Sequence, residues 1–348
     1  MSTTATQPTL LSKPIGPIGY GLMGLTWRPN PQPAEESYKA METALSKGAN
    51  FWNGGEIYGS PQRHSCHLLK EYFTLHPEHA DKVVLSIKGG CKPGTIEPDG
   101  SRENVRRSVE DCLEILDGTK KIDIFECARV DPAVPIEDTV GYLAELVREG
   151  KIGGIGLSEV KASTIERAHA VHPIAVVEVE VSLFGAQQIF ANGVARTCAR
   201  LGIPIVAYSP LGRGALTGPG VRRNADIPEG DFRRFMPRFQ DDVLEQNNRL
   251  VDEVGRLAEK KGVTRPQIAI AWVRQLSGRT VELDGSGEKV TLGTVIPIPG
   301  ATKVERVEEN TKLVELTDDE MEEIAHILRS NPVLGDRYHK HGMALVDG

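Results

Sequence analysis

Short apolar runs alternate along the chain with longer segments in which apolar residues recur every three to four positions. The short runs have the length and the Val and Ile content of buried strands, and we predict eight of them. They span residues 15–23, 49–53, 83–88, 122–127, 152–157, 174–180, 204–208 and 294–298. The longer segments predict amphipathic helices with end signals: an N-cap at Ser101 and glycine stops at Gly48 and Gly150.

Strands that alternate with helices in this way form parallel sheets, and eight such units close a (β/α)₈ barrel. The alternative is an open, doubly wound sheet, which would carry a Gly-rich dinucleotide fingerprint after its first strand. The glycines of "GYGLMG", at residues 19–24, have the spacing of that fingerprint but lie largely within the predicted first strand rather than after it, so no such fingerprint follows the strand. We therefore predict a TIM barrel with long loops at the C-terminal ends of its strands.

The whole chain of 348 residues is predicted to be one barrel domain. Within it, residues 1–14 are expected to be partly flexible, and 211–242 form a connection too long to be ordinary, so we predict a functional loop. Residues 277–293 contain the turn signal Asp284-Gly285 and predict a surface hairpin, and 331–348 form a C-terminal tail.

Composition narrows the class of protein. Hydrophobic residues make up 39% and charged residues 26% of the chain, which favours a globular protein over a disordered one. The net charge of −7 and the absence of a Lys-Arg run argue against nucleic acid as a partner. The sequence shows neither a signal peptide nor a membrane span, so we expect a cytoplasmic protein. We also expect a monomer, because no long exposed apolar stripe is evident in the sequence. Five widely spaced cysteines predict reduced thiols rather than a disulfide or metal site.

Candidate chemistry lies where the predicted strands end, because the active site of such a barrel is built there. The second strand runs into "FWNGGEIYG", which places Asn53, Glu56 and Tyr58 close together, and the third ends at Lys88. A lysine beside a tyrosine stabilises the phenolate, which makes the phenol a proton donor. Such a donor suits carbonyl reduction, in which the hydride must come from a nicotinamide cofactor.

The order and position of several motifs resemble the aldo-keto reductase family. They are "GYGLMG", "FWNGGEIYG", "SIKGG", "IDIFECARVDP", "IGLSE", "AYSPLGRGALTG" and "IPIPGATKVERVEEN". The resemblance implies an N-terminal β-hairpin, Tyr58 as proton donor and Lys88 as its lysine. It also reveals two departures, since Asn53 replaces the family's aspartate and Ala128 its histidine. We expect Asn53 to accept a hydrogen bond from the lysine ammonium and, being uncharged, to leave Tyr58 more acidic than usual.

The resemblance also assigns the remaining site residues. Trp27, Ala128 and Arg129 would line the substrate pocket, and no metal is implied. The residues expected at NADPH, from the nicotinamide to the adenine end, are Ser158, Glu159, Glu178, Tyr208, Ser209, Leu211, Arg213, Gly300, Thr302, Lys303, Arg306, Glu309 and Asn310. Among them Glu159 and Glu178 stand where an Asn and a Gln are usual, so they would only accept hydrogen bonds from the carboxamide.

The combination of "FWNGGE" with "FECARVDP" resembles the fungal pyridoxal reductase branch of the family. It implies NADPH-dependent reduction of pyridoxal, a small-molecule aldehyde, to pyridoxine. The alternatives are a general aldehyde or ketone reductase and an NADPH-binding regulatory protein with little turnover. Retention of both Tyr58 and Lys88 favours an enzyme.

Overall fold

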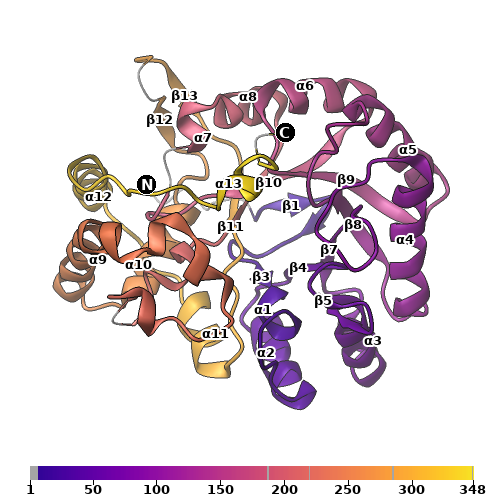
Figure 1. Ribbon diagram of the computed structural model, residues 1–348, viewed down its shortest axis with the longest axis horizontal. Helices are drawn as coiled ribbons and strands as arrows, with labels where there is room; N and C mark the ends of the chain where they lie inside the picture. Colours follow the sequence, from indigo (N-terminus) through magenta and orange to yellow (C-terminus); the bar gives the residue numbers. More distant parts are fainter. Residues whose placement is uncertain (1–6, 186–187, 219, 284–285, 347) are drawn as a thin grey trace.

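Eight parallel strands form one sheet that curves into a barrel in the computed structural model, which describes residues 7–185, 188–218, 220–283, 286–346 and 348 (Figure 1). In chain order they are β3 (Tyr20–Gly21), β4 (Phe51–Gly55), β7 (Val84–Gly89), β8 (Ile122–Cys127), β9 (Ile152–Ser158), β10 (Ile174–Glu180), β11 (Ile205–Tyr208) and β14 (Val295–Pro297). Strands that are consecutive in this list pair in parallel, and a parallel bridge between Gly21 of β3 and Gly300, just after β14, closes the ring. The fold is therefore the predicted (β/α)₈ barrel, and the open sheet is excluded.

Helices surround the barrel in the order in which they follow the strands (Figure 1). They are α1 (Met23–Thr26), α2 (Ala34–Ser46), α3 (Ser65–Leu75), α4 (Arg102–Leu116), α5 (Ile136–Arg148), α6 (Ala162–Val171), α7 (Gln188–Ala191), α8 (Val194–Leu201), α9 (Asp241–Lys261), α10 (Arg265–Arg274), α11 (Val304–Thr311), α12 (Asp318–Ser330) and α13 (Lys340–Met343). The predicted end signals are confirmed: Ser101 Oγ accepts from the Asn104 amide, and Gly48 and Gly150 have positive φ.

The predicted first strand is too long. Of residues 15–23 only Tyr20–Gly21 pair as a strand, and Met23 already belongs to α1. Gly16 and Pro17 lie at the start of this segment, and proline has no amide hydrogen for a ladder. The backbone here is held in other ways, for example by a hydrogen bond of 2.8 Å from the Gly16 amide to Asn50 Oδ1.

The barrel interior is apolar at the N-terminal ends of the strands. Its buried cluster comprises Leu10, Ile15, Phe51, Val84, Ile124, Val176, Val206, Ile296 and Ile298. The hairpin of β1 (Thr9–Leu10) and β2 (Lys13–Pro14) closes this end. Because side chains alternate along a strand, the next inward residues toward the C-terminal ends are polar, as Asn53 follows Phe51 and Ser86 follows Val84. The apolar interior of the barrel thus ends at the level of the predicted site residues.

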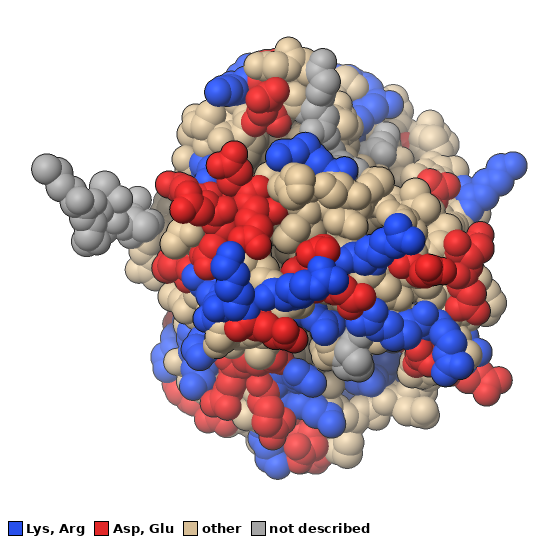
Figure 2. All heavy atoms as spheres, turned by 90° about the vertical axis from the view of Figure 1, so that its left-hand side faces the viewer, with Lys and Arg blue, Asp and Glu red and all other residues tan. Residues whose placement is uncertain are grey.

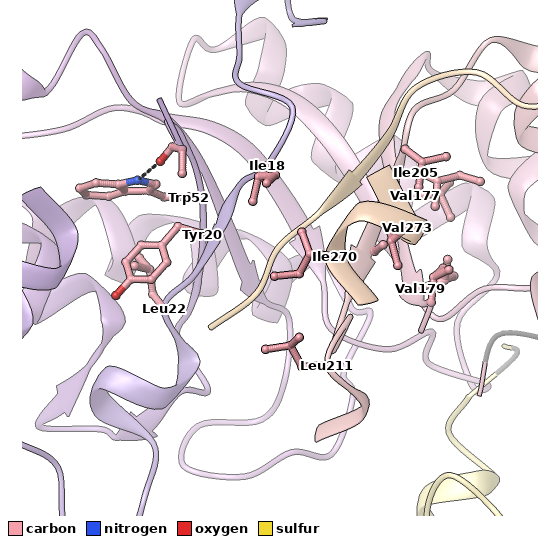
Figure 3. Close-up of a cluster of buried hydrophobic side chains, with 14 of the residues drawn as sticks. Ile18, Tyr20, Leu22, Trp52, Val177, Val179, Ile205, Leu211, Ile270 and Val273 are labelled. Atoms are coloured by element: carbon pink, nitrogen blue, oxygen red, sulfur yellow. Dashed lines mark hydrogen bonds between the residues drawn. The ribbon is translucent and has the colours of Figure 1, made fainter. Parts of the chain in front are cut away.

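A second core lies between the strands and the helices. Figure 3 shows Val177 and Ile205 of neighbouring strands beside Val273 of α10, with Trp52 on the opposite side. The Trp52 indole nitrogen donates to the carbonyl oxygen of Ala49 over 2.8 Å, which satisfies its polar atom inside the core. This outer layer fixes the strands, and hence the positions of the side chains at their ends.

The structure also describes most of the segments that connect the barrel elements. Strands β12 (Thr280–Glu282) and β13 (Lys289–Thr291) form the predicted antiparallel hairpin, whose turn signal Asp284-Gly285 lies outside the described residues. Short 3₁₀ turns run through the predicted loop 211–242, which buries Phe239. All five cysteines are free, and four of them are buried. None of the helices built from described residues is long and apolar enough to span a bilayer.

Charges of both signs are mixed over the side of the molecule that carries α9 and α12 (Figure 2). Ion pairs link these two helices, between Lys260 and Glu323 and between Lys261 and Glu320. This face therefore presents no extended field of one sign of the kind that tracks a phosphate backbone.

Candidate active site

Tyr58 is held in a tight turn directly after β4. Its ring lies against Gly55, where an added Cβ would come within 3.0 Å of the ring, and it stacks on Trp27 at 5.7 Å between centroids. The carbonyl oxygen of Tyr58 accepts a hydrogen bond of 2.6 Å from Thr26 Oγ1. The Gly54-Gly55 pair thus allows the backbone to turn closely enough for Tyr58 to be buried at the C-terminal end of the barrel.

Glu56, the other polar residue of this turn, faces away toward α4. Its carboxylate pairs with Arg107 over 2.5 Å and accepts a hydrogen bond from Ser108. Glu56 therefore anchors the turn that carries Tyr58 and is not part of the proton-transfer group.

Lys88 has two buried carboxylate partners inside the barrel. Its ammonium lies 3.0 Å from Glu126 Oε1 and 2.5 Å from Glu178 Oε1, and the three side chains are at most 4% exposed. The amide nitrogen of Asn53 donates to the same two carboxylates, over 3.0 Å to Glu126 Oε1 and 2.7 Å to Glu178 Oε2. Four side chains from β4, β7, β8 and β10 thus form one connected polar cluster.

This cluster corrects the role expected for Asn53. We expected Asn53 to accept a hydrogen bond from Lys88. Its amide nitrogen instead donates to two glutamates, and both of these bind the Lys88 ammonium. Burial raises the pKa of Tyr58; Lys88 opposes that rise, while Glu178 and Glu126 add to it. The phenol is consequently less acidic than a free tyrosine. That the uncharged Asn53 leaves it more acidic than the usual aspartate would stays a prediction.

Lys88 stays protonated despite its burial. Burial lowers the pKa of the ammonium, but Glu126 and Glu178 more than compensate and raise it above its usual range. The pKa of the Glu178 carboxyl is raised to about 8 by burial, with Lys88 lowering it and Glu126 raising it.

Glu126 is the member of this polar cluster that the sequence analysis missed. It is fully buried, and in "IDIFEC" it lies two residues after Ile124, which points into the barrel interior. The register of β8 places Glu126 next to Lys88 of β7. An acidic residue on the inward side of an apolar strand was the available signal, because unpaired burial of a charge is costly.

Arg129 reaches the barrel opening from the end of β8. Its guanidinium donates to the Ala128 carbonyl oxygen over 2.5 Å and to the Tyr338 hydroxyl over 3.3 Å. The hydroxyls of Tyr338 and Tyr208 lie 3.0 Å apart. Ala128, expected beside the substrate, is buried with 2% exposure. The C-terminal tail therefore contributes Tyr338 to the wall around the predicted pocket residues, a role that no sequence motif indicates.

A second buried ion cluster holds this tail over β9 and β10. Arg337 pairs with Glu159 over 2.8 Å and with Glu180 over 3.4 Å. Arg213 pairs with Glu180 over 2.9 Å, and its guanidinium lies 4.4 Å from the centre of the Tyr338 ring. The tail is further tied by a hydrogen bond from the Gly348 amide to the Glu159 carbonyl oxygen.

These contacts bear on three of the expected cofactor residues. The carboxylates of Glu159 and Glu178 are ion-pair partners of Arg337 and Lys88, so they are engaged within the protein, and their contact with a carboxamide stays a prediction. The Arg213 guanidinium, expected at a pyrophosphate, pairs with Glu180. Ser158 differs from them, since its buried hydroxyl has no hydrogen-bond partner within the described residues and fits a polar ligand group.

Replacing Arg337 with Met is expected to destabilise the fold by about 3–5 kcal/mol, because it leaves the carboxylate of Glu159 buried without its cation. Chemical denaturation measures the change. Arg329→Met, at an exposed position of α12, is the matched control and should change stability by about 0.5 kcal/mol or less. Equal stability of the two variants would contradict the role given to the tail.

The residues expected at the far end of the cofactor gather around α11. Lys303 is the residue before its first turn, and a surface hollow of about 590 Å³ is lined by Thr264, Gln267, Lys303, Glu305, Arg306, Glu308, Glu309 and Lys312. Arg306 pairs with Glu309 over 2.6 Å, and Asn310 is buried. Two cations at a helix N-terminus fit a phosphate group.

The remaining residues expected at NADPH lie between the nicotinamide end and the adenine end of the predicted site. Tyr208 ends β11 and Ser209 follows it with a φ of +49°, which turns the chain toward Leu211. Gly300 pairs with Gly21 where the barrel closes, and the Thr302 hydroxyl accepts from Arg28 over 3.3 Å. These residues therefore follow the C-terminal ends of the last two barrel strands, a common phosphate-binding position in this fold.

Comparison with known proteins agrees with this geometry. The model of the aldo/keto reductase family matches residues 17–329. The chain belongs to this family. A probable pyridoxal reductase 2 of Schizosaccharomyces pombe is 42% identical over 333 residues, covering 94% of this chain and 95% of its own. A putative pyridoxal reductase of Saccharomyces cerevisiae is 38% identical over 343 residues, covering 92% and 95%.

The fold of this aldo-keto reductase is also that of a solved structure. The glycerol dehydrogenase AKR11B4 from Gluconobacter oxydans superposes with a TM-score of 0.78 at 23% identity, covering 96% of this chain and 98% of that one. At this identity the likeness supports the shared barrel. It therefore bears on the fold alone and not on the substrate.

Proposed function

We propose that this aldo-keto reductase uses NADPH to reduce an aldehyde, and that its substrate is pyridoxal, which it converts to pyridoxine. The observation that carries the proposal is a buried phenol, Tyr58, whose proton affinity is tuned by a buried lysine, Lys88, at the C-terminal end of the barrel. A positioned acid of this kind is what reduction of a carbonyl needs.

In the proposed reaction, bound NADPH supplies the hydride that reduces the carbonyl carbon. Tyr58 donates its phenolic proton to the carbonyl oxygen, which gains negative charge as the carbon is reduced. The ammonium of Lys88 then stabilises the phenolate that is left, since its charge opposes the rise in the Tyr58 pKa caused by burial. Trp27, stacked on the phenol, keeps the ring in place and would form one wall of the substrate pocket together with Ala128 and Arg129.

The choice of pyridoxal draws on two observations. The two relatives named pyridoxal reductases cover more than nine-tenths of this chain. In addition, Ala128 offers no side-chain donor to the substrate oxygen, and pyridoxal carries a hydroxyl next to its aldehyde that can supply one. The substrate would thus contribute a polar group that the protein lacks.

A turnover assay with excess NADPH and a panel of aldehydes tests the proposal directly. We expect NADPH oxidation that depends on the aldehyde and is fastest with pyridoxal. Tight NADPH binding without turnover of any aldehyde would instead favour a regulatory protein. Equal turnover of many aldehydes and ketones would favour a general reductase.

We expect NADPH to bind about tenfold or more tightly than NADH, because Lys303 and Arg306 offer two positive charges to a 2′-phosphate and charge-assisted hydrogen bonds are strong. For this contact Arg306 would exchange Glu309 for the phosphate. Fluorescence titration of both cofactors measures the ratio. Lys303→Met should reduce it, whereas Lys312→Met, in the same hollow but beyond the C-terminal end of α11, should not. Equal dissociation constants for the two cofactors would contradict the preference.

A further inference from the structure

The carboxylates that pair with Lys88 come from other strands than the one that the family resemblance implies. The resemblance places an aspartate at position 53 of β4, where this chain has an amide. The two carboxylates on Lys88 come from Glu126 on β8 and Glu178 on β10. We propose that Glu126 and Glu178 together replace the missing aspartate, and that Asn53 is the amide required to bridge them. Only the kinetic consequences of this proposal depend on the proposed function.

The hydrogen bonds explain why position 53 must carry a donor. Asn53 Nδ2 lies within 3.0 Å of an oxygen of each glutamate, and both of these oxygens accept. An aspartate at position 53 would bring a third carboxylate against the other two, with Lys88 as the cation between them. Like charges buried this close are strongly unfavourable. Asn53, Glu126 and Glu178 therefore form a linked set. A substitution at one of these positions requires a compensating substitution at another.

The charge of the cluster supports the replacement. The charged and titratable groups around Glu178 are Lys88 on β7, Glu126 on β8 and Tyr58 after β4. Burial raises the Glu178 pKa to about 8, and the adjacent Glu126 adds to that rise, so Glu178 holds a proton near neutral pH. A protonated Glu178 brings the charge around Lys88 closer to that of a simple lysine–aspartate pair.

A double-mutant cycle tests the linkage. Asn53→Asp, which restores the usual family residue, is expected to lower kcat for pyridoxal reduction by about tenfold or more, and Glu126→Gln should also lower it. The double variant Asn53→Asp/Glu126→Gln keeps the number of acids and lets the amide introduced on β8 donate to the aspartate introduced on β4. We expect its kcat to return to within a few-fold of the wild type, with NADPH affinity unchanged within a few-fold in all three.

Asp123→Asn is the matched control. Asp123 is a buried acid of the same strand that pairs with Lys120 over 2.8 Å and with Lys13 over 2.6 Å, near the N-terminal end of the barrel. Its loss should reduce stability and leave kcat unchanged. A double variant whose kcat loss is the product of the two single losses, or an Asn53→Asp enzyme with wild-type kcat, would overturn the proposal.

Two further readouts separate this proposal from the proposed function. The denaturation midpoint should fall in each single variant and recover in the double variant, and this cycle needs no activity; additive midpoints would overturn the linkage even in an active enzyme. In an active enzyme, kcat should decline above about pH 8, where ionisation of Glu178 adds negative charge beside Tyr58. Glu178→Gln should remove this decline, and a decline that persists would argue against a proton on Glu178.

Discussion

Tyr58→Phe is expected to lower kcat/KM for aldehyde reduction by about 10²–10⁴-fold, the usual contribution of a positioned general acid. The phenylalanine ring preserves the contacts with Gly55 and Trp27, so the fold and the pocket should remain. Because the hydroxyl acts on the substrate oxygen, NADPH affinity should change only a few-fold. Steady-state kinetics with pyridoxal and fluorescence titration of NADPH measure the two effects.

Tyr72→Phe is the control for this substitution. Tyr72 is a fully buried tyrosine of α3 whose hydroxyl bonds His79 over 2.8 Å, and its ring lies 5.4 Å from Trp52 on the outer side of the barrel. Removal of this hydroxyl should leave kcat/KM unchanged within a few-fold. If the Tyr58→Phe enzyme kept most of its kcat, a different group would have to donate the proton.

The second large effect concerns the choice of substrate. We expect kcat/KM for pyridoxal to exceed that for a benzaldehyde of similar size without the adjacent hydroxyl by about 10²–10³-fold, the cost of losing one donor to a developing oxyanion. The physical reason is that Ala128 lacks a donor, while the pyridoxal hydroxyl can bond the same carbonyl oxygen. The comparison is a ratio within one enzyme, so cofactor and expression effects cancel.

Ala128→His should narrow this ratio. A histidine at this buried position would either donate to the oxygen of the simpler aldehyde or crowd the pyridoxal ring. Benzaldehydes reduced as efficiently as pyridoxal, together with no change in either rate on Ala128→His, would contradict both the pyridoxal assignment and the explanation of the missing histidine.

The sequence by itself determined the barrel and the places where chemistry is found. Strand–helix alternation required parallel strands, and the polar residues after Phe51 and Val84 marked the end of the apolar interior. Tyr58 lies just after its strand and Lys88 near the end of its own. The local sequence pattern was therefore enough to select both residues. The same holds for the 277–293 hairpin, whose strands are neighbours in the chain.

Only the tertiary structure decided how the buried charges are paired. Glu126 is separated by 38 residues from Lys88 along the chain, and Arg337 by 178 residues from Glu159. Sequence identifies a buried acid as needing a cation, but the choice among cations depends on barrel register and on where a tail folds back. Hydrogen-bond and ion-pair energies act over a few ångströms of space, irrespective of distance along the chain. For this reason the acidity of Tyr58, set by its burial and by charges from three other strands, could be judged only after the barrel had closed.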